Sequence, residues 1–122
     1  MSTTVFAILY VTDVRRSAQF YADHLGLPIL GESPGFAMLA LPGGAMLGLW
    51  IKGGVQPTVT AAPGGSELAL TLADDATLHA RHQAWAAAGV TILSAPLAMD
   101  FGTSFTAADP DGHRLRLFVP AM

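Results

Sequence analysis

The stretch VFAILYVTD at residues 5–13 decides the fold, because a similar stretch, SELALTLAD, recurs at residues 66–74. Each is a strand-like apolar run that closes on an aspartate, Asp13 in the first copy and Asp74 in the second. Aspartate is a favoured helix N-cap, since its carboxylate accepts hydrogen bonds from the free backbone N–H groups of the first turn. The recurrence predicts a strand followed by a helix, written twice in one chain.

The repeat continues beyond these stretches in the same order. A segment with helical spacing of apolar residues follows each aspartate, and Gly26 and Gly89 are placed to end the two helices. In each copy a short apolar segment comes next, followed by two strand-like runs that a turn joins. The turn is Pro42-Gly43-Gly44 in the first copy and Pro110-Asp111-Gly112 in the second. We therefore predict an α+β fold of two βαβββ modules, with a longer loop between Ser94 and Thr103 in the second copy.

The predicted organisation is a single domain over residues 1–122, with module one at residues 1–56 and module two at residues 64–122. A linker rich in Gly, Pro and Thr, residues 53–65, joins the modules. An unrelated α+β domain with similar turns is the alternative interpretation of the repeat.

Composition narrows the classes of function. The 122 residues are 52% hydrophobic and 12% charged, so the chain buries enough apolar surface to fold. There is no cysteine, which excludes disulfides and thiolate chemistry. The net charge of -3 argues against nucleic acid and anionic membranes as partners. Residues 33–51 carry no charged side chain and are long enough to span a bilayer, but the turn Pro42-Gly43-Gly44 interrupts them and argues against a membrane helix. Because the chain also shows no secretory signal pattern, we expect a cytoplasmic protein.

Strand alternation sorts the side chains onto two faces of each predicted sheet. In the second copy Leu115 and Leu117 share one face, while Arg114, Arg116 and Phe118 share the other. All-aliphatic faces belong against the helices, so the mixed face meets water, a partner or a ligand. In the first copy the corresponding face carries the following side chains: Phe6, Ile8, Tyr10, Met46, Gly48 and Trp50.

Two motifs resemble a known superfamily. Residues 11–14 with 17–21 and 25–27 are similar to the first module of the vicinal oxygen chelate superfamily, which contains glyoxalase, bleomycin-resistance proteins and extradiol dioxygenases. Residues 109–115, closing on Leu117-Phe118, resemble its C-terminal hairpin. The resemblance implies paired βαβββ modules in a homodimer, with concave sheets that form a cleft for a small-molecule ligand.

The resemblance also implies where metal-dependent members keep their ligands. These positions fall here on Phe6, Gly48, Glu67 and Arg116, and among them only Glu67 has a side chain that ligates divalent ions. We therefore expect no metal and no cofactor, as in the metal-free, bleomycin-resistance-like branch of the superfamily.

The candidate ligand-binding residues are the aromatic, methionine and charged side chains of the predicted cleft. Trp50, Tyr10 and Phe118 stack on a planar ligand or simply pack as core. Glu67 and Arg116 either form a structural ion pair or contact the ligand. The longer second loop, which carries Met99 and Phe101, either folds over the cleft or packs at a dimer interface. Met38 and Met46 fall on strands. The complete predicted set is Phe6, Tyr10, Met38, Met46, Trp50, Glu67, Met99, Phe101, Arg116 and Phe118.

Other residues invite chemistry but are expected to be structural. His79 and His82 stand at helical spacing, yet the helices cover the outside of the sheets in this architecture. Trp85 is predicted to lie in the core beneath the second helix.

The leading functional hypothesis is reversible, metal-independent binding of a bulky, partly aromatic small molecule, with antibiotic resistance by sequestration as the outcome. The first alternative is a glyoxalase- or dioxygenase-like lyase or isomerase with Glu67 as general base. A regulatory or purely structural dimer with a closed cleft is the second.

Overall fold

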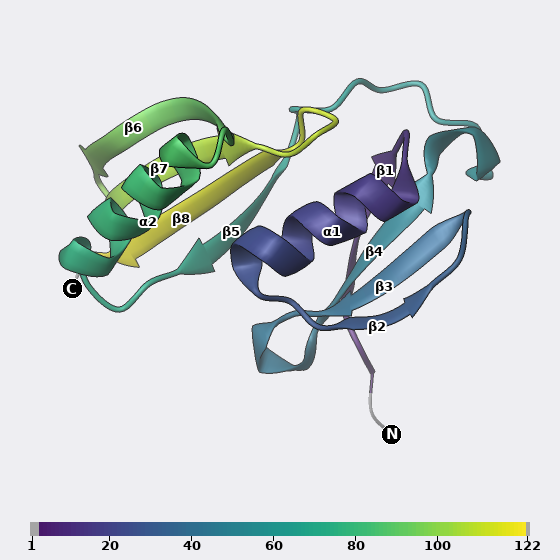
Figure 1. Ribbon diagram of the computed structural model, residues 1–122, viewed down its shortest axis with the longest axis horizontal. Coiled ribbons are helices and arrows are strands. Elements are labelled where there is room, and N and C mark those ends of the chain that lie inside the picture. The colour runs from purple at the N-terminus through teal and green to yellow at the C-terminus, as the bar shows by residue number, and fades with distance from the viewer. Residues whose placement is uncertain (1–2, 122) are drawn as a thin grey trace. The chain divides into compact units, whose positions relative to one another are not determined.

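Each half of the chain builds a four-stranded sheet with one helix packed on one face (Figure 1). The computed structural model describes residues 3–121. The chain divides into two compact units between Ala62 and Pro63, which we call the first and second modules. The first module consists of β1 (Phe6–Val11), α1 (Val14–Leu25), β2 (Ile29–Glu32), β3 (Phe36–Ala40) and β4 (Met46–Ile51). The second consists of β5 (Glu67–Thr71), α2 (Asp75–Ala87), β6 (Thr91–Met99), β7 (Gly102–Ala108) and β8 (Arg114–Pro120).

The two modules share one topology, which confirms the predicted pair of βαβββ units. The strand orders are β1-β4-β3-β2 and β5-β8-β7-β6, and in each sheet the first two strands are parallel and the remaining neighbours antiparallel. The central hairpin of the first module turns at the short 3-10 segment Pro42–Gly44, where the sequence predicts it. A second 3-10 segment, Lys52–Gly54, follows β4.

Both helices begin at the predicted aspartates. The Asp13 carboxylate accepts a hydrogen bond from the backbone N–H of Arg16 at 3.0 Å, and that of Asp74 accepts from Thr77 at 2.7 Å. Gly26 ends α1 in the left-handed conformation with φ 66°, which costs glycine little because it has no Cβ. The local sequence signals therefore fix where each helix starts and where α1 stops.

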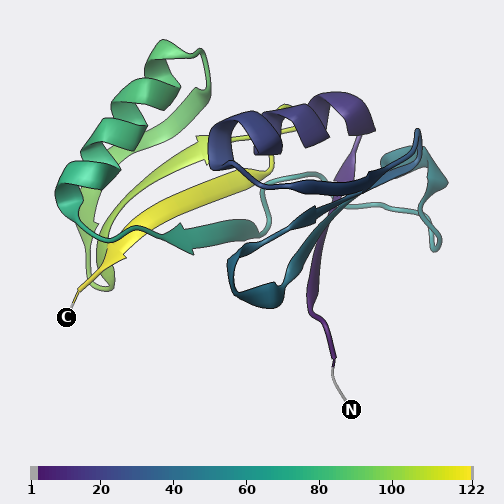
Figure 2. The same cartoon turned by 60° about the horizontal axis from the view of Figure 1, so that its bottom comes forward.

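The core of each module lies between its helix and the facing side of its sheet (Figure 2). In the first module this side carries Leu39, Leu47 and Leu49, all fully buried, and α1 contributes Tyr21. In the second module Phe105, Leu115 and Leu117 take these places, with Leu78 and Trp85 from α2. The opposite side of each sheet, which no helix of the same module covers, is called the open face below.

One prediction about the second module is wrong. The region between Ser94 and Thr103 is not a long loop, because β6 extends to Met99 and pairs with β7 across a tight turn at Asp100 and Phe101. Two register shifts, between Ile92 and Ser94 and between Ser94 and Leu97, interrupt the pairing of β6 with β7. β6 also contains Pro96, a residue that argues against a strand interior, so the local sequence favours a loop.

No helix within residues 3–121 is both long enough and apolar enough to cross a membrane. The uncharged run at residues 33–51 instead forms β3, its turn and β4, as the Pro-Gly-Gly turn predicts.

Candidate functional site

The open face of the first module is apolar and aromatic. Along β1, side chains alternate, and Phe6, Ile8 and Tyr10 remain 43%, 43% and 38% exposed on this face. Their partners across the parallel ladder are Met46, Gly48 and Trp50 of β4, which lie on the same face, as strand alternation predicts. Met38 of β3 pairs with Gly48 and so belongs to the same face. All five predicted site residues of this module therefore lie on one sheet surface.

Trp50 is the centre of an aromatic cluster on that face. Its ring makes edge contacts with Tyr10 at 6.4 Å and with Phe36 at 6.3 Å between ring centroids. Gly48 leaves room for the cluster, because a Cβ at this position would stand 2.8 Å from Cζ of Phe36 and 3.3 Å from Cγ1 of Ile8. The glycine at a position where metal-dependent relatives are expected to keep a ligand thus serves the packing of an aromatic ring.

The open face of the second module is polar at its centre. Arg116 donates from Nε to Glu67 at 2.5 Å and from Nη2 to the other carboxylate oxygen at 3.3 Å. Nη1 of the same guanidinium donates to the Ser104 hydroxyl at 2.9 Å. The side chains of Arg116 and Glu67 are 18% and 31% exposed, so the pair is partly shielded from water. Within residues 3–121, these contacts use three of the five guanidinium N–H groups and leave two without a hydrogen bond.

Aromatic side chains flank this ion pair. Phe101 and Phe118 contact edge to face, with centroids 5.4 Å apart and planes at 87°. The Arg116 guanidinium carbon lies 5.9 Å from the centroid of Phe101, within the range of a cation–π interaction. Met99, at the end of β6, is exposed beside the turn that carries Phe101. The predicted residues of the second module are thus grouped, although Met99 and Phe101 belong to a hairpin end rather than to a loop over the site.

The Arg116 contact lowers the pKa of the Glu67 carboxyl below its ordinary value. The hydrogen bond from Arg116 is the main cause, burial opposes it, and the positive charges of Arg116 and Arg114 reinforce it. A carboxylate stabilised in this way is a weak proton acceptor, since a general base works best with a pKa near the operating pH. The geometry therefore gives little support to Glu67 as a general base.

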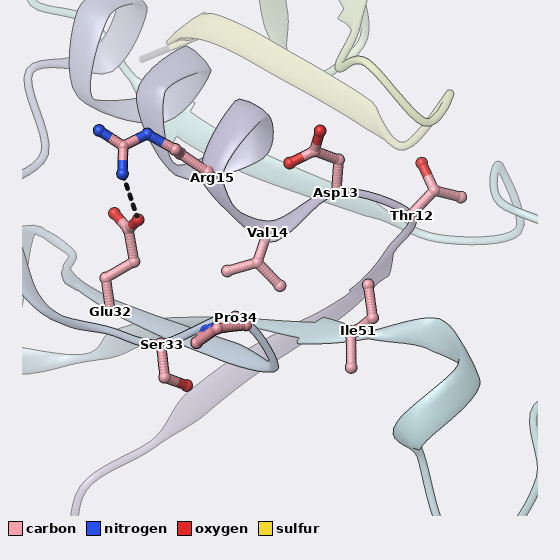
Figure 3. A pocket seen from close by; sticks show the side chains of 8 residues that line it. All are labelled: Thr12, Asp13, Val14, Arg15, Glu32, Ser33, Pro34 and Ile51. Atoms are coloured by element: carbon pink, nitrogen blue, oxygen red, sulfur yellow. Dashed lines mark ion pairs between the residues drawn. The ribbon is translucent and has the colours of Figure 1, made fainter.

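A separate hollow lies where α1 begins (Figure 3). It has a volume of about 550 Å³, and Arg15 and Glu32 form an ion pair of 3.8 Å at its rim. The Asp13 carboxylate at its wall already caps the helix. Its lining residues are Thr12, Asp13, Val14, Arg15, Glu32, Ser33, Pro34 and Ile51, none of which was predicted as a site residue.

Comparison with known proteins establishes the family. A sequence model of the Glyoxalase/Bleomycin resistance protein/Dioxygenase superfamily matches residues 3–117. The chain belongs to this superfamily. The resemblance seen in the two sequence motifs is thereby confirmed at the level of the superfamily.

Three known proteins differ in how much they share with the chain. The phenazine antibiotic resistance protein EhpR of Enterobacter agglomerans is 26% identical over 113 residues, which cover 90% of this chain and 86% of EhpR. The solution structure of protein ATC0852 from Agrobacterium tumefaciens is 42% identical, with a TM-score of 0.88 and full coverage of both chains. A glyoxalase-related enzyme from Fulvimarina pelagi shares the fold, with a TM-score of 0.84 at 22% identity, covering 98% of this chain and 88% of that one.

The resemblance described above implies four positions for metal ligands, and the side chains at these positions decide whether a divalent ion fits. Phe6 and Gly48 offer no donor atom, and Arg116 is a permanent cation that occupies both oxygens of Glu67. Within the described part of the chain, no three His, Cys, Asp or Glu residues gather in a way that would hold a metal ion. The residues at the expected positions do not fit a metal.

His82 and Trp85 of α2 both pack against the core. His82 and Trp85 both contact the buried ring of Phe105, with centroids at 5.4 Å and 5.5 Å. Trp85 is only 3% exposed, which confirms its predicted place in the core.

Sequence reasoning missed two residues of the open faces. Phe36 contacts Trp50, and counting outward from the Pro42-Gly43-Gly44 turn pairs these residues, so the hairpin signal was sufficient to find it. Ser104 binds Arg116, and no local signal marks it, because its partner lies on the neighbouring strand β8.

Proposed function

We propose that this protein binds a planar, partly aromatic small molecule without a metal ion and confers resistance to it by sequestration. The observation that carries the proposal is the aromatic cluster of Trp50, Tyr10 and Phe36 on a sheet face that no helix of its module covers. Stacking between flat rings and burial of apolar surface are the interactions that such a face supplies.

The similarity to EhpR supports the class of ligand. That relative is named for resistance to phenazine antibiotics, and the phenazine nucleus is a flat system of three fused rings. Such a ligand presents little but aromatic surface to a protein, and the exposed side chains of Phe6 and Tyr10 are suited to cover it.

In this proposal the predicted residues divide into two roles. On the first module Phe6, Tyr10, Met38, Met46 and Trp50 provide apolar contact area, and on the second module Met99, Phe101 and Phe118 do so. The methionines adapt to the outline of a ligand. Arg116, held in place by Glu67 and Ser104, directs its two remaining N–H groups to an acceptor on the ligand. We further propose a homodimer as the working form, which sedimentation of the purified protein would test.

Tryptophan fluorescence tests the proposal directly, because the chain has two tryptophans in contrasting places. In the Trp85→Phe variant, emission comes from Trp50 alone, and phenazine should quench it with saturation. Replacing Trp50 by Leu should weaken binding by roughly 10-fold or more, measured by calorimetry. The Trp85→Phe variant, altered only in the core, should bind as the unaltered protein does. If Trp50→Leu binds every planar aromatic compound as tightly as the unaltered protein, the site is wrong.

A further inference from the structure

The charges on the second module's sheet do not balance. Its four strands contain three charged residues, Glu67, Arg114 and Arg116, in a chain whose net charge is -3. Glu67 faces two arginines, since it is the ladder partner of Arg114 and is hydrogen-bonded to Arg116. One positive charge on the open face is therefore left without a counter-charge.

Arg114 is the arginine that Glu67 does not hydrogen-bond, although its charge also lowers the pKa of that carboxyl. Both oxygens of Glu67 accept from Arg116, and the ladder partner of Arg114 on its other side is Ala108, which has no polar side chain. Across residues 3–121, Arg114 makes no hydrogen bond through its side chain and no ion pair, and its Nε is buried without an acceptor. Burying a guanidinium N–H without an acceptor costs free energy, so this arrangement indicates a missing partner.

A second polar group at this end of the face also lacks a partner. Thr106 is 1% exposed, and its Oγ1 makes no hydrogen bond within the described chain. Thr106 is the ladder partner of Arg116, which places it diagonally across from Arg114 on the same face. Diagonal neighbours on a sheet are within reach of a long side chain such as arginine. The Nε of Arg114 and the hydroxyl of Thr106, both buried without a hydrogen-bond partner, thus belong to diagonal neighbours on one face of the sheet.

From this arrangement we infer that the open face of the second module binds a carboxylate group, which pairs with the guanidinium of Arg114 next to the Thr106 hydroxyl. The inference rests on the proposed function and adds the class of compound, a planar aromatic acid. The planar guanidinium matches a carboxylate with two parallel hydrogen bonds, and a threonine hydroxyl donates a third. A neutral carbonyl would accept the hydrogen bonds but leave the positive charge of the face uncompensated.

Two matched probes separate this inference from the proposed function. Phenazine-1-carboxylate and phenazine-1-carboxamide have the same rings and nearly the same shape, but only the first is ionised near neutral pH. Calorimetry at low ionic strength should show the carboxylate binding the unaltered protein roughly 10-fold or more tightly, as expected for a charge-assisted contact. Equal affinities would overturn the inference and leave the proposed function standing. Binding of neither compound would overturn both.

Variants assign the preference to Arg114. In Arg114→Gln the ratio of the two affinities should fall to near one, whereas Arg114→Lys, which keeps the charge but loses the planar fork, should retain part of it. Arg81→Gln removes the same charge from helix α2 and should keep the full ratio. A full ratio in Arg114→Gln would overturn the inference. Thr106→Val should lower the affinity for the carboxylate by a few-fold, and an unchanged affinity would remove the hydroxyl from the site.

Discussion

The two open faces occupy equivalent positions of one repeated architecture but differ in chemistry. In the first module the ladder pairs Phe6 with Met46, and in the second the same place pairs Glu67 with Arg114. Gly48, the counterpart of Arg116 in the repeat, makes room for a ring, whereas Arg116 binds Glu67 and Ser104. The repeated backbone therefore sets the positions of the side chains. The residue differences between the two copies decide whether a face is apolar or carries charged, hydrogen-bonding groups.

The largest effect is expected at the hairpin that carries Phe101 in the second module. Gly102 has φ +143°, and a Cβ there would stand 1.9 Å from the backbone oxygen of Val119. Because a backbone atom cannot move aside cheaply, Gly102→Ala should lower the free energy of unfolding by roughly 3 kcal/mol or more. Urea denaturation measures the loss. Gly31→Ala in β2, where no atom lies within 4 Å, is the matched control and should change little.

A smaller loss is expected from filling the first open face. Gly48→Ala places a Cβ 2.8 Å from the Phe36 ring, which must shift and disturb its contact with Trp50. Overpacking of this kind costs about 1–3 kcal/mol. The emission of Trp50, read in a Trp85→Phe background, should change with it. Full stability together with unchanged emission would show that the ring cluster tolerates the methyl group, against the role assigned to Gly48.

The ion pairs of the two modules should differ in strength. Arg116→Met removes two hydrogen bonds to Glu67 and one to Ser104, and should cost about 1 kcal/mol. In a double-mutant cycle with Glu67→Gln, we expect a coupling of about 0.5–1 kcal/mol. The pair of Arg15 and Glu32 in the first module is longer, at 3.8 Å, and Arg15 is 87% exposed, so Arg15→Gln should have almost no effect. Similar coupling in both pairs would contradict the contrast.

The smallest effect is the dependence of stability on pH. The pKa of Glu67 is lowered in the folded protein, so its ion pair stabilises the fold above the ordinary value of 4.5. This contribution disappears as the pH falls through the lowered pKa, and should stay under about 1 kcal/mol. Denaturation between roughly pH 7 and pH 3 should therefore show a shallower acid loss for Glu67→Gln than for the unaltered protein. Parallel curves would show that the pair adds no pH-dependent stability.

The architecture was predictable because its signals are local and occur twice. The aspartate caps, the glycine after α1 and the Pro-Gly-Gly turn each act within a few residues, and strand alternation then places Phe6 and Met46 on the same face. The grouping of Glu67 with Arg116 followed from the same register. What each candidate site residue does for a ligand stays a prediction.

Features that depend on distant partners were not predictable from local patterns. Pro96 argues against a strand at this point of the sequence, and only the pairing of β6 with β7 shows that the strand continues to Met99. Arg114 was placed on the correct face, but its lack of a partner emerges only when Ala108 and the committed oxygens of Glu67 are known. The spacing of residues along a chain predicts which face of a sheet each side chain takes. Whether its hydrogen-bonding groups find partners depends on the neighbouring strands.

The bulged strands show how a chain with so many apolar residues limits edge-to-edge aggregation of its sheets. β2 and β6 are each the last strand in the order of their sheet, and both contain register shifts. An edge strand offers unpaired N–H and C=O groups to any passing chain, and bulges distort that template. Pro96 in β6 also removes a donor from the edge. These irregularities protect two sheet edges from edge-to-edge aggregation and leave the apolar side chains of the open faces in place.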